Sequence, residues 1–352
     1  MKMCLSVVLP ILLLTGCSHI RRVPVAVAIP KPVLNKAIVP VVSDAPPGGL
    51  AHWQAGSGIV YCFAFSPDGK QLTTIDQSCE VKVWDPVNGK LLHSFQAPDD
   101  NISEVVYSPN GRWIASRGDK KELSFIDIFN AHTRHLILRL PSESAGVSTL
   151  RFSHDSNILF AADKKIRIWD TRTWRNLYHL KTDDSAMLIP NGQCFVRCST
   201  DGIIRVCDAR TGRIVKTWRE ARGGGNYSYD LKSISNGGET LLVSYYDNGR
   251  MTLNDHSYLR FVKVSNSHLI RSLSGDNVNS QAAFSPHGDT IANWSFDNIG
   301  PDQLAFWNVR TGQYKQVYSG GVLSAAFSPD GKTVAMSDTM GGINIFRVPN
   351  WQ

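Results

Sequence analysis

Seven aspartates recur at similar spacing from residue 50 onward, and carboxylates in register could bind a metal ion or act as acids and bases. They are Asp76, Asp119, Asp163, Asp201, Asp247, Asp297 and Asp338. Each lies between two strand-like runs, where the carboxylate of a turn residue accepts hydrogen bonds from the backbone N–H groups that follow it. We therefore favour a structural role in turns over a metal or catalytic role.

Cysteine chemistry is limited to one pair. Cys194 and Cys207 lie on successive predicted strands, and a hairpin turn over residues 199–202 would place them directly opposite each other. They could then form a disulfide in an oxidising compartment, whereas a one-residue change of register would separate them. Cys194 and Cys198 are four residues apart with no histidine nearby, so no zinc site is predicted.

Standard catalytic motifs are absent from the sequence. Gly331-Lys332-Thr333 is similar to the end of a phosphate-binding loop, but Ala326 stands where the first glycine is required. The ten histidines are scattered, with no pair at metal-ligand spacing. The sequence therefore predicts no cofactor, no metal site and no catalytic residue.

A repeating turn sets the positions of the seven aspartates. In Ser66-Pro67-Asp68-Gly69, Pro fixes φ, while Gly tolerates the positive φ of a tight turn. Each copy follows an alternating run such as residues 61–65, which predicts a half-buried strand. The other copies, spaced 36 to 50 residues apart, are Ser108-Pro109-Asn110-Gly111, Ser153-His154-Asp155-Ser156, Ile189-Pro190-Asn191-Gly192, Ser235-Asn236-Gly237-Gly238, Ser285-Pro286-His287-Gly288 and Ser328-Pro329-Asp330-Gly331.

A third strand-like run follows each aspartate and ends in a residue pair. The pairs are Trp84-Asp85, Ile126-Asp127, Trp169-Asp170, Cys207-Asp208, Asn254-Asp255, Trp307-Asn308 and Phe346-Arg347. With a period of roughly 40 to 45 residues, residues 50–348 resemble the WD-repeat family. The resemblance implies an all-β fold, a seven-bladed WD-repeat β-propeller with four strands per blade. The Gly-His pair that usually opens a family repeat is absent, so the tetrad built on that histidine is not expected.

The last repeat ends after its third strand, at Val348. When the turns are aligned, Gln54-Ala55 matches Gln96-Ala97 at the end of a fourth strand. We therefore expect the N-terminal strand over residues 50–54 to pair with the last three strands and close the ring, which removes two exposed sheet edges.

The N-terminus predicts export. Lys2 precedes an apolar run over residues 5–14, too short to span a membrane as a helix. Leu14-Thr15-Gly16-Cys17 resembles the bacterial lipobox, which implies acylation of Cys17 and removal of residues 1–16; an ordinary signal with an incidental cysteine is the alternative. Ser18 follows the cysteine and favours the outer membrane over retention in the inner membrane.

Residues 17–49 form the predicted tether, because their six prolines disfavour both helices and central strands. Pairing of its Val-rich parts with a partner is the alternative. The predicted domains are thus a signal peptide over 1–16, the lipidated Cys17 with a Pro-rich tether over 17–49, and the propeller over 50–352.

Two groups of residues are candidate partner-binding sites. Arg117, Lys120, Lys121, Lys164 and Lys165 fall in hairpins of neighbouring repeats and could bind an acidic partner, or could be solvated hairpin tips. Arg222, Tyr227 and Tyr229 belong to a Gly-rich loop of the kind that forms binding hot spots, although Tyr229 could instead begin a core strand.

The charge balance argues against nucleic acid as the partner. The net charge is +7, and removal of Lys2 with the signal leaves a mild excess with no long basic run. We expect a membrane-anchored, non-enzymatic protein–protein interaction scaffold of the bacterial envelope, on the periplasmic side of the outer membrane. The alternative is an exported propeller enzyme, quinoprotein-like or lactonase-like, with a site in the axial channel.

Overall fold

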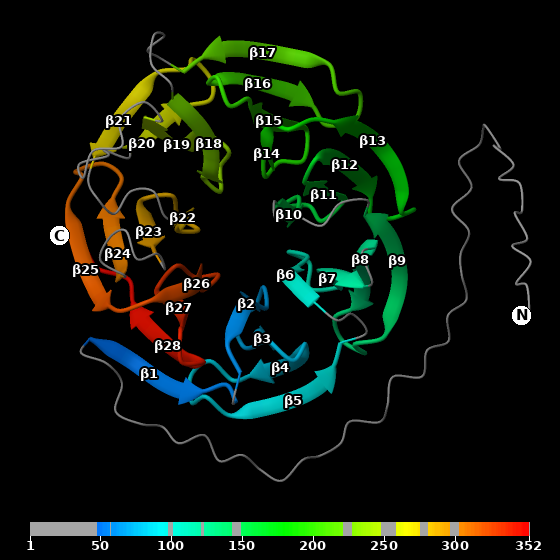
Figure 1. Cartoon of the computed structure of the whole chain (residues 1–352), viewed down its shortest axis with the longest axis vertical. Coiled ribbons are helices and arrows are strands. Elements are labelled where there is room, and N and C mark those ends of the chain that lie inside the picture. The colour runs from blue at the N-terminus through cyan, green and yellow to red at the C-terminus, as the bar shows by residue number, and fades with distance from the viewer. Residues whose placement is uncertain are drawn as a thin grey trace, which may run out of the picture.

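The computed structural model describes residues 48–56, 58–97, 101–120, 123–142, 149–220, 227–247, 258–274, 281–295 and 303–351. These residues form 28 strands in seven four-stranded antiparallel sheets arranged in a ring (Figure 1). The predicted seven-bladed β-propeller is confirmed. No described residue lies in a helix, so none forms a helix long enough to cross a membrane.

Each blade is one sheet, with its first strand at the centre of the ring and its fourth strand outside (Figure 1). Blade 1 is β2 (Val60–Phe65), β3 (Leu72–Asp76), β4 (Glu80–Trp84) and β5 (Leu91–Gln96). Blade 2 is β6 (Asn101–Tyr107), β7 (Trp113–Lys120), β8 (Leu123–Asn130) and β9 (Leu136–Ser142). Blade 3 is β10 (Thr149–Phe152), β11 (Ile158–Ala162), β12 (Lys165–Asp170) and β13 (Arg175–Lys181).

The remaining blades follow the same order. Blade 4 is β14 (Ser185–Leu188), β15 (Cys194–Cys198), β16 (Ile203–Asp208) and β17 (Ile214–Arg219). Blade 5 is β18 (Tyr227–Ile234), β19 (Thr240–Asp247), β20 (Tyr258–Lys263) and β21 (Leu269–Ser274). Blade 6 is β22 (Gln281–Phe284), β23 (Thr290–Trp294), β24 (Gln303–Asn308) and β25 (Tyr314–Ser319).

Blade 7 joins the two ends of the described chain. Strands β26 (Val322–Phe327), β27 (Thr333–Asp338) and β28 (Gly342–Arg347) are completed by β1 (Gly49–Gln54), which pairs with β28 from Gly49↔Phe346 to Gln54↔Gly342. Trp53 of β1 is 1% exposed and packs 6.2 Å from Trp84 of blade 1, measured between ring centroids. The predicted closure of the ring by the N-terminal strand is confirmed.

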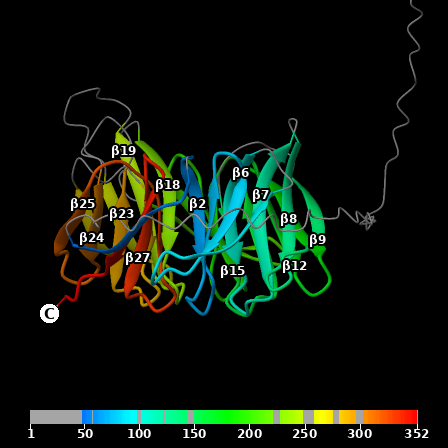
Figure 2. The same ribbon diagram turned by 90° about the horizontal axis from the view of Figure 1, so that it is seen from below.

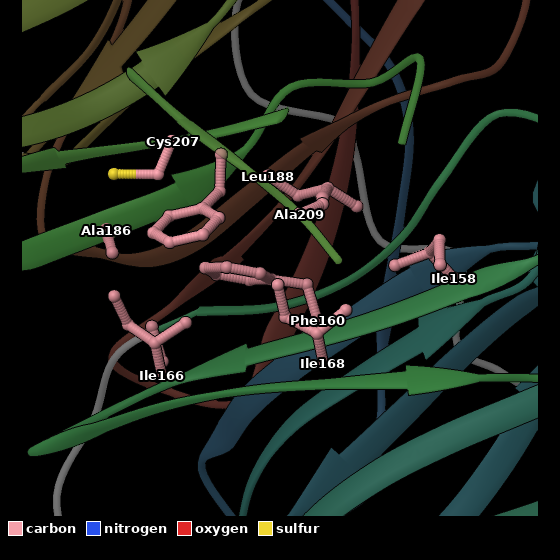
Figure 3. Close-up of a cluster of buried hydrophobic side chains, with 10 residues drawn as sticks. Ile158, Phe160, Ile166, Ile168, Ala186, Leu188, Cys207 and Ala209 are labelled. Carbon is pink, nitrogen blue, oxygen red and sulfur yellow. The ribbon is translucent and has the colours of Figure 1, made fainter. Parts of the chain in front are cut away.

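The core consists of apolar layers between neighbouring blades. Figure 3 shows one of them, in which Phe160, Ile166 and Ile168 of blade 3 face Ala186, Leu188 and Cys207 of blade 4. Each blade is too thin to bury both of its faces alone. Burial of apolar surface therefore couples every blade to two neighbours.

The repeating turn has the expected geometry in most blades. In blade 1 the Gly69 N–H donates to the Ser66 carbonyl oxygen over 2.8 Å, and Gly69 has a φ of +71°. The Ser66 hydroxyl donates to Asp68, and the Gln71 N–H donates back to that hydroxyl. The turn thereby satisfies its own polar groups.

Two of the predicted residue pairs were placed in the wrong register. The structural equivalents of Trp84-Asp85 are Phe129-Asn130 in blade 2 and Val262-Lys263 in blade 5, because the Asn130 and Lys263 N–H groups form the bond that Asp85 forms in blade 1. Blade 2 has eight-residue β7 and β8, so its hairpin is longer than in blade 1. Ile126 and Asp127 lie within β8, and Asn254-Asp255 falls outside the described residues.

The expected facing of Cys194 and Cys207 is also wrong by one residue. Cys194 lies opposite Asp208, and Cys207 lies opposite Phe195. The two thiols therefore point to opposite faces of blade 4: Cys207 packs toward blade 3 and Cys194 toward blade 5 (Figure 3 shows Cys207). Burial raises the pKa of both thiols, and both are free.

Candidate interaction surface

The ring has two faces with different connections. The second-to-third strand turns and the links between blades lie on one face, which we call the upper face (top of Figure 2). The Ser-Pro-Asp-Gly turns, the third-to-fourth strand turns and the C-terminus lie on the lower face. Asp76, Asp163, Asp201 and Asp338 lie in or beside upper-face turns.

Three of these aspartates bind the backbone of the turn that follows them. The Asp76 carboxylate accepts the N–H groups of Ser78 and Glu80, and Asp338 accepts those of Met340 and Gly342. Asp163 accepts the Lys165 N–H over 2.6 Å.

The other four aspartates are placed differently. Asp201 is half-exposed, accepts the Ser199 hydroxyl and pairs with Arg219 at 3.2 Å. Asp119 lies one residue before the end of β7, and Asp247 is the last residue of β19, as Asp76 is of β3. The segments that follow Lys120 and Asp247 lie outside the described residues, so the turn role of these two aspartates stays a prediction. Asp297 lies outside the described residues.

Blades 3 and 4 share an unusual charge arrangement. Asp163 is bound by Arg167 at 3.2 Å and lies 3.6 Å from Arg117 of blade 2, and all three side chains are at least nine-tenths buried. Burial lowers the pKa of Arg167, and the like charge of Arg117 lowers it further, although Asp163 opposes both effects. Two guanidinium groups thus share one carboxylate.

Blade 4 also places two arginines around one carboxylate. Asp184 is bound by Arg197 at 2.6 Å and lies 3.9 Å from Arg205. In blade 1 the ratio is reversed, because Lys82 binds both Asp76 at 2.8 Å and Glu80 at 2.9 Å. In blades 3 and 4, therefore, two cations share one carboxylate, whereas in blade 1 one cation serves two carboxylates.

Three lysines meet at the upper corner of blade 3, which we call the lysine corner. Lys165 of β12 lies directly opposite Lys181 of β13 in the sheet. Lys164 is exposed and its carbonyl oxygen accepts the Thr182 N–H, next to Lys181. Like charges directly opposite each other across two strands destabilise a sheet. A surface that keeps them together is well suited to an anionic partner.

The predicted binding residues divide into three groups. Lys164 and Lys165 lie in the lysine corner as expected, whereas Arg117 is 4% exposed and opposite Glu104, so it supports the blade interface and is not a surface contact. Lys121 and Arg222 lie outside the described residues; the backbones of Lys120 and Tyr227 lie in β7 and β18. Tyr229 is buried and stacks on Tyr245, which agrees with the core alternative.

Lys181 was missed by the sequence analysis. It ends a fourth strand, and its position opposite Lys165 depends on a register shift between Ile168 and Trp169. The run of basic residues at 164 and 165 was visible, but the third lysine could be found only by aligning the outer strand through that bulge.

The channel side of blade 2 contains an acidic group that titrates near neutral pH. Burial raises the pKa of Glu104 to about 7, opposed by Arg151, by the Leu150 N–H that Glu104 accepts, and by Arg117. Ser185 forms the same kind of link two interfaces further on, between blades 4 and 5, since its hydroxyl accepts the Leu231 N–H. Both side chains satisfy N–H groups of the next blade's innermost strand.

Replacing Glu104 by Gln should flatten part of the pH dependence of stability. Because the pKa of Glu104 in the folded state lies above its ordinary value of 4.5, the folded state holds a proton that the unfolded state has lost, and stability falls as pH rises between about 4.5 and 7. At pH 8, E104Q should be more stable than the parent by about 1–3 kcal/mol. Denaturant unfolding of both proteins from pH 4.5 to 8 measures the difference; parallel curves would contradict it.

The described residues contain no cluster of metal-ligand side chains. No group of three His, Cys, Asp or Glu side chains among them could hold a metal ion. A small cavity of about 30 Å³ lies between blades 1 and 2 and is lined mainly by apolar side chains. Two of its lining hydroxyls, those of Thr73 and Tyr107, hydrogen-bond to each other at 2.6 Å.

Comparison with known proteins finds WD40 repeats in the N-terminal part of the chain. Residues 50–85, 89–121 and 134–170 match the model of the WD domain, G-beta repeat. Each match begins at or just before a fourth strand and continues into the next blade, so the sequence repeat is offset from the blade by one strand. This offset is the reason that β1 completes blade 7.

Curated relatives are similar at low identity. The COMPASS component SWD3 of Saccharomyces cerevisiae is 28% identical over 179 residues, which cover 46% of this chain and 54% of that protein. Protein tipD of Dictyostelium discoideum is 22% identical over 310 residues, 84% of this chain and 47% of that protein. An uncharacterized WD repeat-containing protein of Synechocystis, sll1491, is 24% identical over 170 residues, which cover 46% of this chain and 47% of that protein. The chain spans about half the length of these relatives.

Proposed function

We propose that this chain is a non-enzymatic protein–protein interaction scaffold whose upper face, at blades 2 to 4, binds an acidic segment of a partner protein. The carrying observation is the lysine corner, where Lys165 and Lys181 are cross-strand neighbours and Lys164 is exposed beside them. Below it, two buried arginines share Asp163. An acidic segment of a partner would complement the charge of these three lysines.

Rigidity supports the same proposal. Lys165 and Lys181 are carried by paired strands of a closed ring, so a partner meets two side chains whose backbone is already ordered. Charge complementarity of this kind mainly increases association rate and specificity.

We also propose that Cys17 is acylated and anchors the protein to the periplasmic side of the outer membrane in a bacterial envelope. The support is the sequence Leu14-Thr15-Gly16-Cys17 after an apolar run, with Ser18 next. Several acyl chains hold a protein on a bilayer almost permanently. After an alkaline carbonate wash, which removes proteins held on a bilayer surface by non-covalent contacts, the parent should stay with the membranes and Cys17→Ser should not; a variant that still sediments after this wash would overturn the anchor.

The partner proposal is tested by crosslinking in native membranes and identifying what co-purifies. The double variant Lys164→Glu/Lys181→Glu should reduce recovery of the partner at least tenfold, because it inverts the charge of the lysine corner. Lys90→Glu/Lys315→Glu, which makes the same change at exposed positions on other blades, is the matched control and should retain the partner.

The alternative, an exported propeller enzyme, predicts a different outcome. No protein would co-purify, while a small molecule would stabilise the chain against heat. Equal loss of partner in both double variants would also contradict a site at the lysine corner.

A further inference from the structure

The lower outer rim of the propeller carries a second, independent pattern. We define this rim as the turns between third and fourth strands and the first two residues of the following outer strands. At the matching end of blade 7, Gly49 begins β1 opposite Phe346, next to Leu50. All of these positions lie at the end of the ring where the third strands finish.

Large aliphatic side chains are exposed at this rim in blade after blade. Val87, in the β4–β5 turn, is 84% exposed, and Val215, the second residue of β17, is 65% exposed. The others are Leu50, Leu92, Ile137, Ile214, Leu269 and Ile270. Single exposed aliphatics are ordinary on soluble proteins, but recurrence at one position in most blades is a pattern.

Blades 4 and 5 show the strongest exposure. Ile214 and Val215 are both exposed, although successive side chains of a strand point to opposite faces. At the start of β17, therefore, the side chains on both faces of the strand are exposed to solvent. Leu269 and Ile270 repeat this arrangement at the start of β21.

Basic residues flank these aliphatics. Those exposed in the same blades are Lys90, Arg210, Arg213 and Lys263, while Arg172, Arg175 and Arg310 are exposed in the corresponding turns of blades 3 and 6, which expose no such aliphatic side chain. Arg172 is paired with Asp170 at 3.0 Å. The acids of these turns serve mainly as backbone acceptors: Asp85 accepts the Val87 N–H and Asp208 accepts those of Arg210 and Thr211. The described rim is therefore cationic and aliphatic.

We propose that the lower outer rim is a docking surface for an anionic lipid bilayer. Aliphatic side chains that enter the headgroup region, next to Lys and Arg that attract acidic lipids, are the features of interfacial membrane binding. The positions surround the ring, so an extended planar surface contacts more of them together than a compact protein does. The 47 residues before Gly48 join the propeller at this same end.

This inference rests on the proposed scaffold function and adds an orientation to it, because a propeller docked by its lower rim has the lysine corner on the side away from the bilayer. It does not depend on acylation of Cys17. Lower-rim docking places the upper face toward the solvent, where a soluble partner can reach the lysine corner.

Sedimentation of the full chain carrying Cys17→Ser with lipid vesicles tests the proposal. It should bind vesicles of phosphatidylglycerol and phosphatidylethanolamine, and bind phosphatidylcholine vesicles at least tenfold more weakly. Arg210→Gln/Arg213→Gln should weaken binding to the anionic vesicles about tenfold or more, since each basic residue near such a surface contributes roughly a fivefold factor. Val215→Ser/Ile270→Ser should weaken binding to the anionic vesicles severalfold. This loss should remain at high salt, because it removes apolar contacts and no charge.

The matched control is Lys164→Gln/Lys181→Gln, which removes two charges from the upper face and should leave vesicle binding unchanged. The proposal is overturned if the parent does not bind anionic vesicles, or if the control weakens binding as much as the rim variants. Circular dichroism of each variant confirms that the sheets remain folded. Because partner recovery is measured separately, failure here leaves the acidic-partner proposal standing.

Discussion

Replacing Trp53 by Ala should lower the free energy of unfolding by about 3–5 kcal/mol, the usual loss for a large buried aromatic side chain. Trp53 lies on β1, is 1% exposed, and packs with Trp84 and Ile343 in the cluster between blades 7 and 1. Its loss empties the seam at which the ring closes. Equilibrium denaturation in guanidinium measures the change.

Two variants on the same strand and site separate closure from a general effect of mutation. Leu50→Ala removes a half-exposed side chain of β1 and should change stability by less than about 0.5 kcal/mol. Trp53→Phe should lose less than Trp53→Ala, because it keeps most of the apolar surface and the indole N–H has no hydrogen-bond partner among the described residues. Equal effects of Trp53→Ala and Leu50→Ala would show that β1 does not close the ring.

Replacing Asp163 by Ala should cost a similar amount, about 3–5 kcal/mol, because it leaves Arg117 and Arg167 buried without their shared carboxylate. The Lys165 N–H also loses its acceptor. Asp163→Asn should lose less, since its side-chain oxygen still accepts that N–H. Thermal and denaturant unfolding of the parent, Asp163→Asn and Asp163→Ala should rank their stabilities in that order.

Asp183→Ala is the matched control for this prediction. Asp183 is an exposed carboxylate between the lysine corner and Asp184, so its removal should change stability by less than about 0.5 kcal/mol. If Asp163→Ala were as mild as Asp183→Ala, the two arginines would not depend on Asp163, and the account of the shared carboxylate would be wrong.

The fold could be predicted from the sequence because its turns are local. Gly69 and its counterparts have positive φ values that the turn chemistry requires, and each such turn fixes the two strands beside it. Closure was also predictable, since β1 has the sequence of a fourth strand without the three before it. Both signals depend on residues within one hairpin.

The errors arose where register between strands decides the outcome. A turn over residues 199–202 would have placed Cys194 and Cys207 on one face, but the pairing differs from that register by one residue, so they lie on opposite faces of blade 4. The third strand of blade 2 was predicted to end at Asp127, but the strands of this blade are longer and β8 ends at Asn130. Sequence spacing alone does not contain the length of an individual hairpin.

The candidate site was predicted only in part, for a related reason. Lys164 and Lys165 stand together in the sequence, so their proximity was evident. Lys181 joins them through pairing of β12 with β13, and Arg117 leaves the surface because its strand faces Glu104 in the neighbouring strand. Partners of this kind are set by tertiary packing and not by local pattern.

A photoreactive crosslinker at position 164, used in intact cells, tests the central claim most directly. The account predicts one protein adduct, carrying an acidic segment, that is abolished by Lys181→Glu and absent when the crosslinker is placed at position 315 on the outer strand of blade 6. No protein adduct at position 164, or the same adduct at both positions, would contradict an interaction surface at the lysine corner.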